Sequence, residues 1–516
     1  MLKCKLLLGA ASLLSGSMGI AAEKIAEKTN FVVIMCDDVS FDMFGCYGNQ
    51  NTKTPNIDRL ANQGVVFGTA WNSAICSPAR AEIMSGCYAT TTGSYYNELA
   101  IPEGKGKRGQ NKKIFNYHTT FSKILNDQGY QTAVAGKWHI GGAEHQDDEV
   151  VGFDTYCMWE GVETYEKITG KKWGGGVEIP AKSKSGAGVK STRYWHPCII
   201  QDHKEVKTTK NDFGPDIFCE FICDFIESAS KEENPFLAYY PMTLPHGPYI
   251  ETPLTTDCGS NNPKKDSRLS NNKRFELMIN YVDILVGRVM TTLERSGALE
   301  NTVIVFTADN GTAVTAKSRG VERAAHVPFI VAGKGVKQRG MTREICDATD
   351  VLPTLVGLSS IGYPEGFACD GVDMTPFLTG AKDTHKPVIQ AYSASTQMLR
   401  TKDHMLEVVD PILGVPNGRF YYCGDSNDGK GYLRAENRES SQETLKMFKK
   451  LLSTEYVGLT KDHPYWKTKR GLRFMTKYTK PKVALKHLHN HRDYQVYDEK
   501  LVYDESTKWT PASSIK

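Results

Sequence analysis

The residues best suited to chemistry begin with Cys76 and Arg80, which share the short run CSPAR. Pro78 is typical of the first turn of a helix and Gly86 of the position just past its end, so the run predicts a short helix with Ser77 as its N-cap. Cys76 would then stand just ahead of a helix N-terminus, where backbone N–H groups favour anions, within reach of Arg80. This placement indicates chemistry on an anionic ester. A structural cysteine before an ordinary helix is the alternative that the run leaves open.

Oxygen-bearing side chains follow two predicted strands, directly or after two further residues. The apolar runs at residues 31–36 and 303–306 are typical of strands buried on both faces of a parallel sheet. The side chains that follow them are Asp37, Asp38, Asp309 and Asn310. Because ligands bind at the carboxyl ends of such strands, this set predicts a site for Ca²⁺ or Mg²⁺ rather than for zinc. A capping pair before a turn is the alternative for the two adjacent aspartates.

Several runs together resemble the signatures of the type I, formylglycine-dependent sulfatases of the alkaline phosphatase-like superfamily. The run from Cys76 to Gly86 resembles C-x-P-x-R followed by a hydrophobic residue and Ser-Gly. The runs GKWHIG at residues 136–141 and PHGP at residues 245–248 resemble the second signature and the PHxP turn of that family. The resemblance covers roughly residues 28–380, with the signatures in the right order. It implies a sulfatase, a hydrolase of sulfuric esters, in which Cys76 is converted to formylglycine (3-oxoalanine).

The resemblance also implies which residues act. The implied catalytic residues are Cys76, Arg80, Lys137, His139, His246 and Lys317. The implied metal ligands are Asp37, Asp38, Cys76, Asp309 and Asn310. In the family, the hydrated aldehyde attacks sulfur, the arginine and the two lysines hold the sulfate, one histidine assists the nucleophile and the other protonates the leaving alcohol. The implied cofactors are formylglycine and a calcium ion, and the implied protein partner is a formylglycine-generating or anaerobic sulfatase-maturating enzyme.

Two less regular segments are the candidates for substrate specificity. Residues 155–215 are rich in Lys, Gly and Ser and are interpreted as a long excursion from the sheet, with a flexible surface insertion as the alternative. Residues 322–328 stand where the family has Glu-Gly-Gly-x-Arg-Val-Pro, but the glycines and the arginine are replaced. The candidate substrate-binding residues are Arg193, Trp195, His196, Arg323 and His326. Together with a strongly basic segment at residues 461–496, these residues favour a sulfated polysaccharide or oligosaccharide as the substrate.

The elements that must position these residues follow from the alternation of buried strands and amphipathic helices. This alternation predicts an α/β fold with a doubly wound, mostly parallel sheet sandwiched by helices, and a smaller C-terminal α+β subdomain. Strands that end before Asp37, Lys137, His246 and Asp309 should release these side chains at one edge of the sheet. The predicted parts are a signal peptide at residues 1–22, a sulfatase catalytic domain at residues 23–385 and the subdomain at residues 386–516.

Length and composition set the broad class of the protein. The chain has 516 residues, a net charge of +4 and 40% hydrophobic residues, as in a globular protein of more than one domain. It has no Walker loop, zinc-finger spacing or RNA-binding signature, so no nucleic acid partner is expected. The basic start and apolar run before residue 22 predict a signal peptide. A secreted or periplasmic protein without membrane association after cleavage is therefore expected, with a single membrane anchor as the alternative. The 13 cysteines define no disulfide pattern.

Two other functions stay open at this point. A phosphonate or phosphodiester hydrolase of the same superfamily could share the scaffold, the metal and the formylglycine. A non-catalytic, glycan-binding relative could share the fold alone, although the full set of candidate groups argues against it. Rates on matched sulfate and phosphate aryl esters would test the first alternative, and the mass of the peptide that contains Cys76 would test the second.

Overall fold

The structure is a computed structural model that describes most of the chain between residues 29 and 467. The described residues are 29–95, 97, 118–140, 151–178, 190–255, 270–312, 317–318, 320–393, 395–412, 416–459 and 464–467. The predicted signal peptide lies outside them, as do residues 461–463 and 468–496 of the basic segment. The expectations about these two segments therefore stay predictions.

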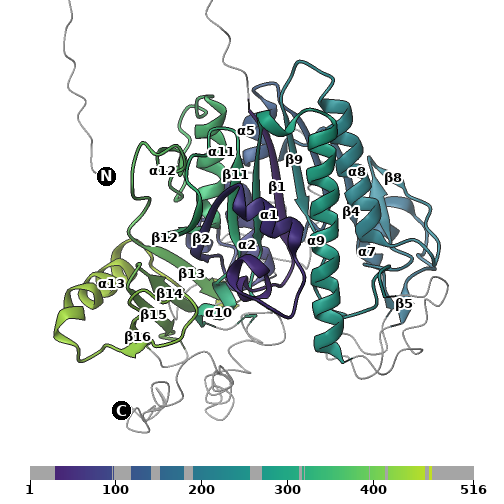
Figure 1. Cartoon of the computed structure of the whole chain (residues 1–516). Helices are drawn as coiled ribbons and strands as arrows, with labels where there is room; N and C mark the ends of the chain where they lie inside the picture. The colour runs from purple at the N-terminus through teal and green to yellow at the C-terminus, as the bar shows by residue number, and fades with distance from the viewer. Residues whose placement is uncertain are drawn as a thin grey trace, which may run out of the picture.

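A ten-stranded sheet forms the centre of the protein, in the order β12-β2-β11-β10-β1-β9-β3-β4-β7-β8 (Figure 1). Its strands are β1 (Asn30–Cys36), β2 (Gly64–Trp71), β3 (Gln131–Gly136), β4 (Thr155–Trp159), β7 (Ile199–Gln201), β8 (Lys204–Glu205), β9 (Phe236–Pro241), β10 (Thr302–Ala308), β11 (Phe329–Gly333) and β12 (Gly340–Asp347). The neighbours from β10 to β4 pair in parallel, as do β12 and β2, whereas β11 and β7 run antiparallel to their neighbours. Every residue of β1, β9 and β10 is buried, which is why these strands are continuous apolar runs in the sequence.

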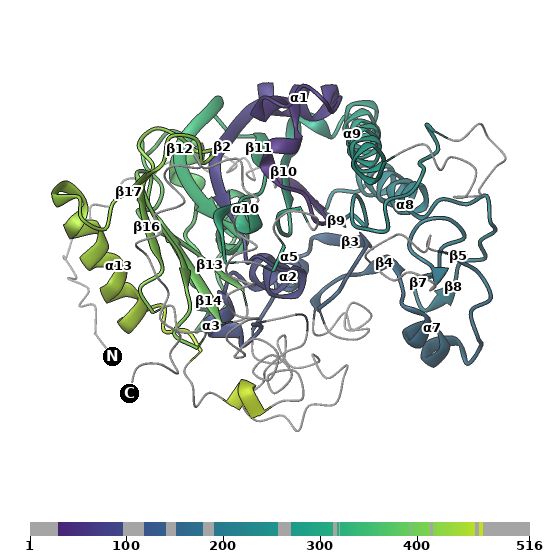
Figure 2. The ribbon, with the colours of Figure 1, turned by 90° about the horizontal axis from the view of Figure 1, so that it is seen from below.

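Helices cover both faces of this sheet (Figure 2). On one face lie α1 (Pro55–Asn62), α8 (Gly214–Ala229) and α9 (Asn271–Arg295). On the other face lie α2 (Cys76–Ser85) and α5 (Phe121–Asn126), with α11 (Val351–Ser359) packed against both. The other α-helices of the described ranges are α3 (Ala89–Thr92), α7 (Val162–Thr169), α10 (Glu322–Ala325), α12 (Thr375–Leu378) and α13 (Gln442–Thr454). The predicted doubly wound, mostly parallel α/β fold is therefore confirmed.

A smaller antiparallel sheet lies beside β12 and β2 (Figure 1). Its strands, in spatial order, are β13 (Ile389–Ser393), β14 (Thr396–Arg400), β15 (His404–Val409), β16 (Arg419–Tyr422) and β17 (Leu433–Arg434). Phe448 of α13 is buried against this sheet and meets the ring of Phe420 edge to face. Arg400 of β14 pairs with Glu322 of α10 at 2.9 Å. This buried ion pair connects the smaller sheet to helix α10. The expected smaller α+β subdomain is therefore confirmed.

Residues 155–215 differ from the predicted excursion. This segment contributes β4, β7 and β8 to the main sheet, while β5 (Val177–Glu178) and β6 (Lys190–Ser191) form a separate two-stranded sheet. The central residues of β4 are buried, and β4 pairs with β3 on one side and with β7 on the other. The prediction of an excursion is wrong for these strands, which are too short to show periodicity. As a consequence, the residues between β6 and β7 are held against the edge of the sheet.

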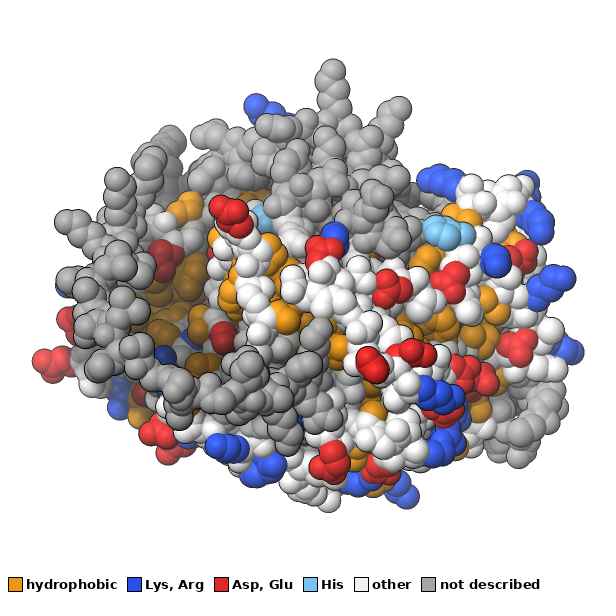
Figure 3. All heavy atoms as spheres, turned by 90° about the horizontal axis from the view of Figure 1, so that it is seen from above, with side chains coloured by type: hydrophobic (Ala, Val, Ile, Leu, Met, Phe, Trp, Pro, Cys, Tyr) orange, Lys and Arg blue, Asp and Glu red, His pale blue; other side chains and the backbone are white. Residues whose placement is uncertain are grey.

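The described surface carries mixed charge. Among the described residues, acidic and basic side chains are interspersed over the face seen from above (Figure 3). The described part of the chain contains eleven cysteines, and all of them are free thiols. Within the described ranges, no helix combines the length and the apolar character needed to span a bilayer.

Candidate active site

The helix that carries Cys76 begins two residues earlier than expected. α2 starts at Cys76 itself, with Ile75 in the N-cap position, and it ends before Gly86, whose positive φ of 69° suits glycine. Ser77 is therefore not the N-cap, and its hydroxyl instead donates to the carbonyl oxygen of His139, 2.7 Å away. Every residue of α2 is buried, which fixes Cys76 at the N-terminal end of a well-packed helix.

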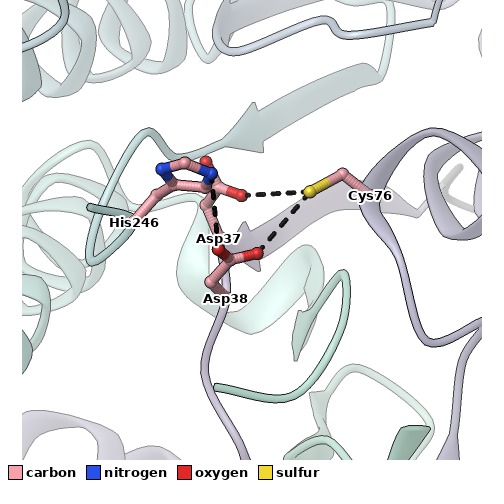
Figure 4. Close-up of side chains that lie close together, drawn as sticks. All are labelled: Asp37, Asp38, Cys76 and His246. Carbon is pink, nitrogen blue, oxygen red and sulfur yellow. Dashed lines mark hydrogen bonds and ion pairs between the residues drawn. The ribbon is translucent and has the colours of Figure 1, made fainter. Parts of the chain in front are cut away.

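Four parallel strands deliver polar side chains to the same edge of the main sheet. β1 ends before Asp37, β10 before Asp309 and β3 before Lys137. The chain after β9 turns to place His246 beside them, with Nε2 of its ring 3.3 Å from Oδ2 of Asp38. Figure 4 shows the two aspartates and the histidine beside the thiol at the start of α2. The structure thus brings together the strand ends that the sequence predicted to converge.

Two lysines and two aspartates surround the sulfur atom of Cys76. Nζ of Lys317 lies 2.6 Å and Nζ of Lys137 lies 3.6 Å from Sγ. Oδ1 of Asp38 lies 3.5 Å and Oδ1 of Asp37 lies 3.8 Å from the same atom. Each lysine also donates to one of these aspartates, Lys137 to Asp37 at 2.7 Å and Lys317 to Asp38. Position 76 is thus in reach of groups that can bind an anion and of groups that can bind a cation.

The unmodified thiol of Cys76 is a poor nucleophile in these surroundings. Burial, followed by the negative charge of Asp309, raises the pKa of Cys76 to about 12, although Lys137 and Lys317 oppose the shift. A thiol with such a pKa stays protonated at neutral pH, whereas the thiolate is the form that attacks. The site therefore does not favour catalysis by a cysteine thiolate.

The guanidinium of Arg80 contacts Asp309 and the main chain of Lys137, and these contacts position the site. It is fully buried, and its Nε and Nη2 lie 3.0 and 2.8 Å from Oδ2 of Asp309. Its Nη1 donates to the carbonyl oxygen of Lys137 at 2.7 Å. Oδ1 of Asp309 accepts hydrogen bonds from the backbone N–H groups of Asp38 and Asn310, at 3.0 and 2.8 Å. Arg80 and Asp309 therefore fix helix α2 to the ends of β1, β3 and β10.

Both aspartates after β1 are ionised. Burial alone would raise the pKa of Asp37, but the charges of Lys137 and Arg80 help to hold it well below its usual range. Burial would likewise raise the pKa of Asp38, and the neighbouring His246 and Lys317 lower it further than burial raises it. Two adjacent buried carboxylates in this state need positive charge around them.

The oxygen atoms of this cluster fit a divalent cation. Potential ligand atoms of Asp37, Asp38, Cys76 and His246 all lie within 4.8 Å of one another. Nδ2 of Asn310 donates to Asp38 at 2.9 Å, whereas its buried Oδ1 has no hydrogen-bond partner among the described residues. Oδ2 of Asp38 is buried too, and Nε2 of His246 lies 3.3 Å from it. A hard cation such as Ca²⁺ would bind the free oxygen of Asn310 together with carboxylate oxygens of Asp37 and Asp38, so the residues present fit the ion that the sequence predicted.

His246 is held between two oxygen atoms. Its Nδ1 lies 2.5 Å from the carbonyl oxygen of Gly247, and its Nε2 lies 3.3 Å from the carboxylate of Asp38. Burial and then the charge of Arg193 lower the pKa of His246 to about 3, whereas the negative charges of Asp38 and Asp37 oppose this shift. A bound anion would add negative charge beside the ring, which raises the pKa of His246 and favours its protonated form.

His139 stands at the open side of the site. Its side chain is exposed, and its backbone adopts a positive φ of 59°. The pKa of His139 lies well below its usual range, through desolvation and through the charges of Lys137, Arg80 and Lys317. Because the ring is exposed, we attribute most of this shift to the three cations. His139 is therefore neutral and able to accept a proton.

The candidate substrate-binding residues of the 155–215 segment differ in their contacts. Arg193 reaches the cluster, with its Nη1 3.2 Å from Oδ2 of Asp37. Trp195 donates through Nε1 to the carbonyl oxygen of Glu251 at 3.0 Å. The ring of His196 packs on a tryptophan of the same segment. Arg193 is thus the member of this group that the structure brings to the site.

The structure does not bring Arg323 and His326 to Cys76. Arg323 pairs with Asp42 at 2.6 Å, at the wall of a separate pocket. His326 is 0% exposed, and its Nε2 donates to the carbonyl oxygen of Gly68 at 3.0 Å. The ring of His326 is thus directed at the main chain of β2 and not at Cys76, and a role for His326 in substrate binding stays a prediction.

Two aromatic residues of the 155–215 segment belong to the site, although they were not among the candidate substrate-binding residues. Tyr194 donates its hydroxyl to the carbonyl oxygen of Thr243 at 2.8 Å and to that of His246, and so holds the turn that carries the histidine. The ring of Trp159 lies under the guanidinium of Arg193, with its centre 4.4 Å from Cζ. The signal in the sequence was the richness of this segment in aromatic residues.

Comparisons with known proteins agree with this geometry. A family model described as Sulfatase matches residues 29–361. The chain is 27% identical over 376 residues to an ulvan-active sulfatase of Formosa agariphila, covering 68% of this chain and 65% of the relative, just under two thirds of its length. It is 27% identical over 396 residues to arylsulfatase A of Homo sapiens, covering 71% of this chain and 70% of that relative. The crystal structure of Ps i-CgsB shares the fold, with a TM-score of 0.64 and 22% identity over 87% of this chain and 97% of that one.

Proposed function

The chain belongs to the sulfatase family, and on this premise we propose that it hydrolyses sulfate esters with a formylglycine made from Cys76. The observation that carries the proposal is the set of contacts around the sulfur atom. Two lysine nitrogens lie within 3.6 Å of it and two carboxylate oxygens within 3.8 Å. An anionic group that reacts at this position would meet fixed positive charge, which stabilises negative charge as it develops. The raised pKa of the unmodified thiol supports the same proposal.

The site fits both groups that the family implies. Asp37, Asp38, Asp309 and Asn310 would hold a calcium ion, and the buried Oδ1 of Asn310, which has no hydrogen-bond partner among the described residues, supports this assignment. When present, the calcium ion would offset charge on the sulfate and the formylglycine would supply the attacking oxygen. Production of the aldehyde would require a formylglycine-generating or anaerobic sulfatase-maturating enzyme as a partner.

Side chains of the protein would bind the sulfate, position the site and accept a proton. Lys137 and Lys317 would bind sulfate oxygens, since both already lie beside position 76. Arg80 would act as a positioning residue, because its donors are directed at Asp309 and at the main chain of Lys137. This differs from the direct sulfate contact that the family resemblance implies for the arginine. His139, which is exposed and neutral, would accept a proton from the nucleophile.

His246 would donate a proton to the leaving alcohol. Its ring stands within reach of the cluster, 3.3 Å from Asp38, on the turn held by the hydroxyl of Tyr194. A sugar alkoxide leaves poorly without a proton, so a donor at this place suits a carbohydrate ester.

The substrate class that we propose is a sulfated carbohydrate. Arg193 and Trp159 of the 155–215 segment lie at the site and supply a cation and an aromatic surface, a combination that suits a sulfated sugar. The name of one relative, an ulvan-active sulfatase, supports the same class. Export to the periplasm or outside the cell is proposed from the apolar run near the N-terminus alone.

Paired aryl esters test the reaction class. We expect the protein, produced together with a maturation enzyme, to hydrolyse 4-nitrophenyl sulfate faster than 4-nitrophenyl phosphate, and Cys76→Ala to release no nitrophenolate from either. A preference for the phosphate ester or for a phosphodiester would favour the alternative hydrolase of the same superfamily. No hydrolysis by protein that is shown to carry the aldehyde would favour a glycan-binding relative.

A further inference from the structure

Arg193 is a fourth cation in the active site, and it comes from the segment between β6 and β7. Its Nη1 lies 3.2 Å from Oδ2 of Asp37, and the residue is 8% exposed. Its guanidinium lies over the ring of Trp159 at 4.4 Å, a distance at which a cation is attracted to the face of an indole. The charge is therefore largely shielded from water, and it is directed at the metal-type carboxylates.

Contacts on both sides hold this arginine in place. Nε1 of Trp159 donates to Oγ1 of Thr192 at 3.2 Å, which fixes the indole under the guanidinium. Tyr194, the next residue after the arginine, donates to the carbonyl oxygen of Thr243 at 2.8 Å and to that of His246. The main sheet and the turn that follows β9 thus both anchor the segment. A group held in this way loses little conformational freedom when it binds a ligand.

Charge in the site is unbalanced once this residue is counted. The buried carboxylates are Asp37, Asp38 and Asp309. The cations beside them are Arg80, Lys137, Lys317 and Arg193. Without Arg193, each carboxylate already has one cation within 2.8 Å. A divalent metal ion would increase the excess of positive charge, and a sulfate monoester supplies a single negative charge. Excess charge shielded from water is unfavourable unless further anions offset it.

We propose that Arg193 binds a second anionic group of the substrate, a carboxylate or a second sulfate close to the ester that is hydrolysed. The proposal rests on the proposed function as a sulfatase and narrows its substrate class to saccharides with two or more neighbouring anionic groups. Arginine suits this role because its planar guanidinium forms paired hydrogen bonds with carboxylate and sulfate oxygens. The stacking on Trp159 leaves the edge of the guanidinium, rather than its face, for such bonds.

Aryl esters test this inference without knowledge of the sugar. The probes are phenyl sulfate, 2-carboxyphenyl sulfate and benzene-1,2-diyl disulfate, and the variants are Arg193→Met and Arg193→Lys. We expect Arg193→Met to lower kcat/KM for at least one of the two dianionic esters by about 10- to 100-fold more than for phenyl sulfate, mainly through KM. The response of the carboxylate and disulfate probes separates the two kinds of second anion. For Arg193→Lys, kcat/KM on the dianionic esters should lie between those of the wild type and Arg193→Met. Lysine keeps the positive charge but cannot form the paired hydrogen bonds of a guanidinium.

Arg288→Met is the matched control, since this arginine lies on α9 and pairs with Asp216. It should treat the three probes as the wild type does, which excludes a general effect of net charge. Differences in leaving group cancel, because each variant is compared with the wild type on the same ester. Equal losses on all three probes would overturn the proposal and show that Arg193 binds the scissile sulfate itself.

A binding measurement separates this inference from the proposed function. In the Cys76→Ala background, isothermal calorimetry should show tighter binding of a dianionic probe than of phenyl sulfate, and addition of Arg193→Met should remove the difference. This result supports the inference even if no probe is hydrolysed. If the wild type hydrolyses phenyl sulfate but shows no preference for a second anion in rate or binding, the inference fails and the sulfatase function stands.

Discussion

Lys137 and Lys317 each bridge the sulfur atom of Cys76 and one carboxylate. Lys137 donates to both oxygens of Asp37 at 2.7 Å, and Lys317 donates to Asp38. A lysine is a compact charge on a flexible stem, so each can turn from its aspartate to a substrate oxygen without a change in the backbone. A cation bound by the two aspartates would neutralise their negative charge in place of the lysines. Both lysines can therefore serve the carboxylates or a substrate anion.

His246→Ala should slow esters with poor leaving groups far more than activated esters. We expect a loss of about 10²- to 10⁴-fold in kcat/KM on a sugar sulfate, and under roughly tenfold on 4-nitrophenyl sulfate, because nitrophenolate leaves without a proton. His203→Ala, which removes an exposed histidine in the turn between β7 and β8, is the control. Similar losses on both esters would show that His246 binds the substrate and does not donate a proton.

Ca²⁺ should raise the melting temperature of the protein, and Asp38→Asn should weaken this effect. The substitution keeps the shape of the side chain but removes one charge and one ligand oxygen. Binding at a free Ca²⁺ concentration of about 100 times Kd stabilises a protein by about 2.7 kcal/mol, so the shift is measurable without any activity assay. Thermal scans over a range of Ca²⁺ concentrations, with Asp428→Asn as the control, make the comparison. The metal assignment fails if Ca²⁺ raises the melting temperatures of the wild type and of Asp38→Asn equally, or raises neither.

Among the elements, α1 is capped by a residue of another helix. The side chain of its N-cap residue Thr54 accepts no hydrogen bond from the backbone N–H groups of the first turn. Asp283 of α9 is 2% exposed, and its Oδ1 accepts from the backbone N–H groups of Asn56 and Ile57, both at 2.9 Å. Its Oδ2 accepts from Nδ2 of Asn56, also at 2.9 Å. α1 and α9 are thus fixed to each other on one face of the main sheet.

Asp283→Leu should lower the free energy of unfolding by about 2–3 kcal/mol, because two donors at the start of α1 lose a charged acceptor. Asp283→Asn keeps one acceptor oxygen and should cost less. Urea denaturation measures both, with Glu220→Leu on the exposed side of α8 as the control. A stability of Asp283→Leu equal to that of the wild type would rule out this role for the aspartate.

The length and burial of each element decided how much of it could be predicted. β1, β3, β9 and β10 are almost entirely buried, so their apolar runs and the polar residues after them are visible in the sequence. β7 and β8 have three and two residues and leave no such run. The contact between Arg193 and Asp37, 156 residues apart, depends on these short strands. The burial of His326 depends on β2, which lies far away in the sequence, and no local pattern reveals it.

For the molecule as a whole, Lys386 links the end of the main sheet to the smaller one. Its Nζ lies 2.8 Å from Asp347 and 2.6 Å from Asp350, and β13 begins three residues later, at Ile389. Burial alone would raise the pKa of Asp350, but Lys386 and then His385 lower it to about 2. Both aspartates are buried, and Lys386 pairs with both of them, whereas His385 contacts Asp350 alone, at 3.0 Å.

Lys386→Met should destabilise the protein by about 3–5 kcal/mol at neutral pH, because two buried carboxylates lose their cation. The folded pKa of Asp350, about 2, lies below its unfolded value of about 3.9. Its stabilising contribution is therefore complete above that unfolded value and is lost as the pH falls toward 2. The difference in stability between wild type and variant should narrow on acidification from about pH 5 to about pH 3. Urea midpoints over this range test the prediction, and a difference that stays constant would contradict it.

The central claim is that residue 76 acts as a formylglycine, and mass spectrometry of the peptide that contains it is the most direct test. Protein is prepared with graded co-expression of the maturation enzyme, and the aldehyde fraction of the peptide is measured beside the specific activity on 4-nitrophenyl sulfate. We predict that activity rises in proportion to the aldehyde fraction and is absent from Cys76→Ala at every level of the maturation enzyme. Full activity in a preparation whose peptide carries only the thiol would contradict the account.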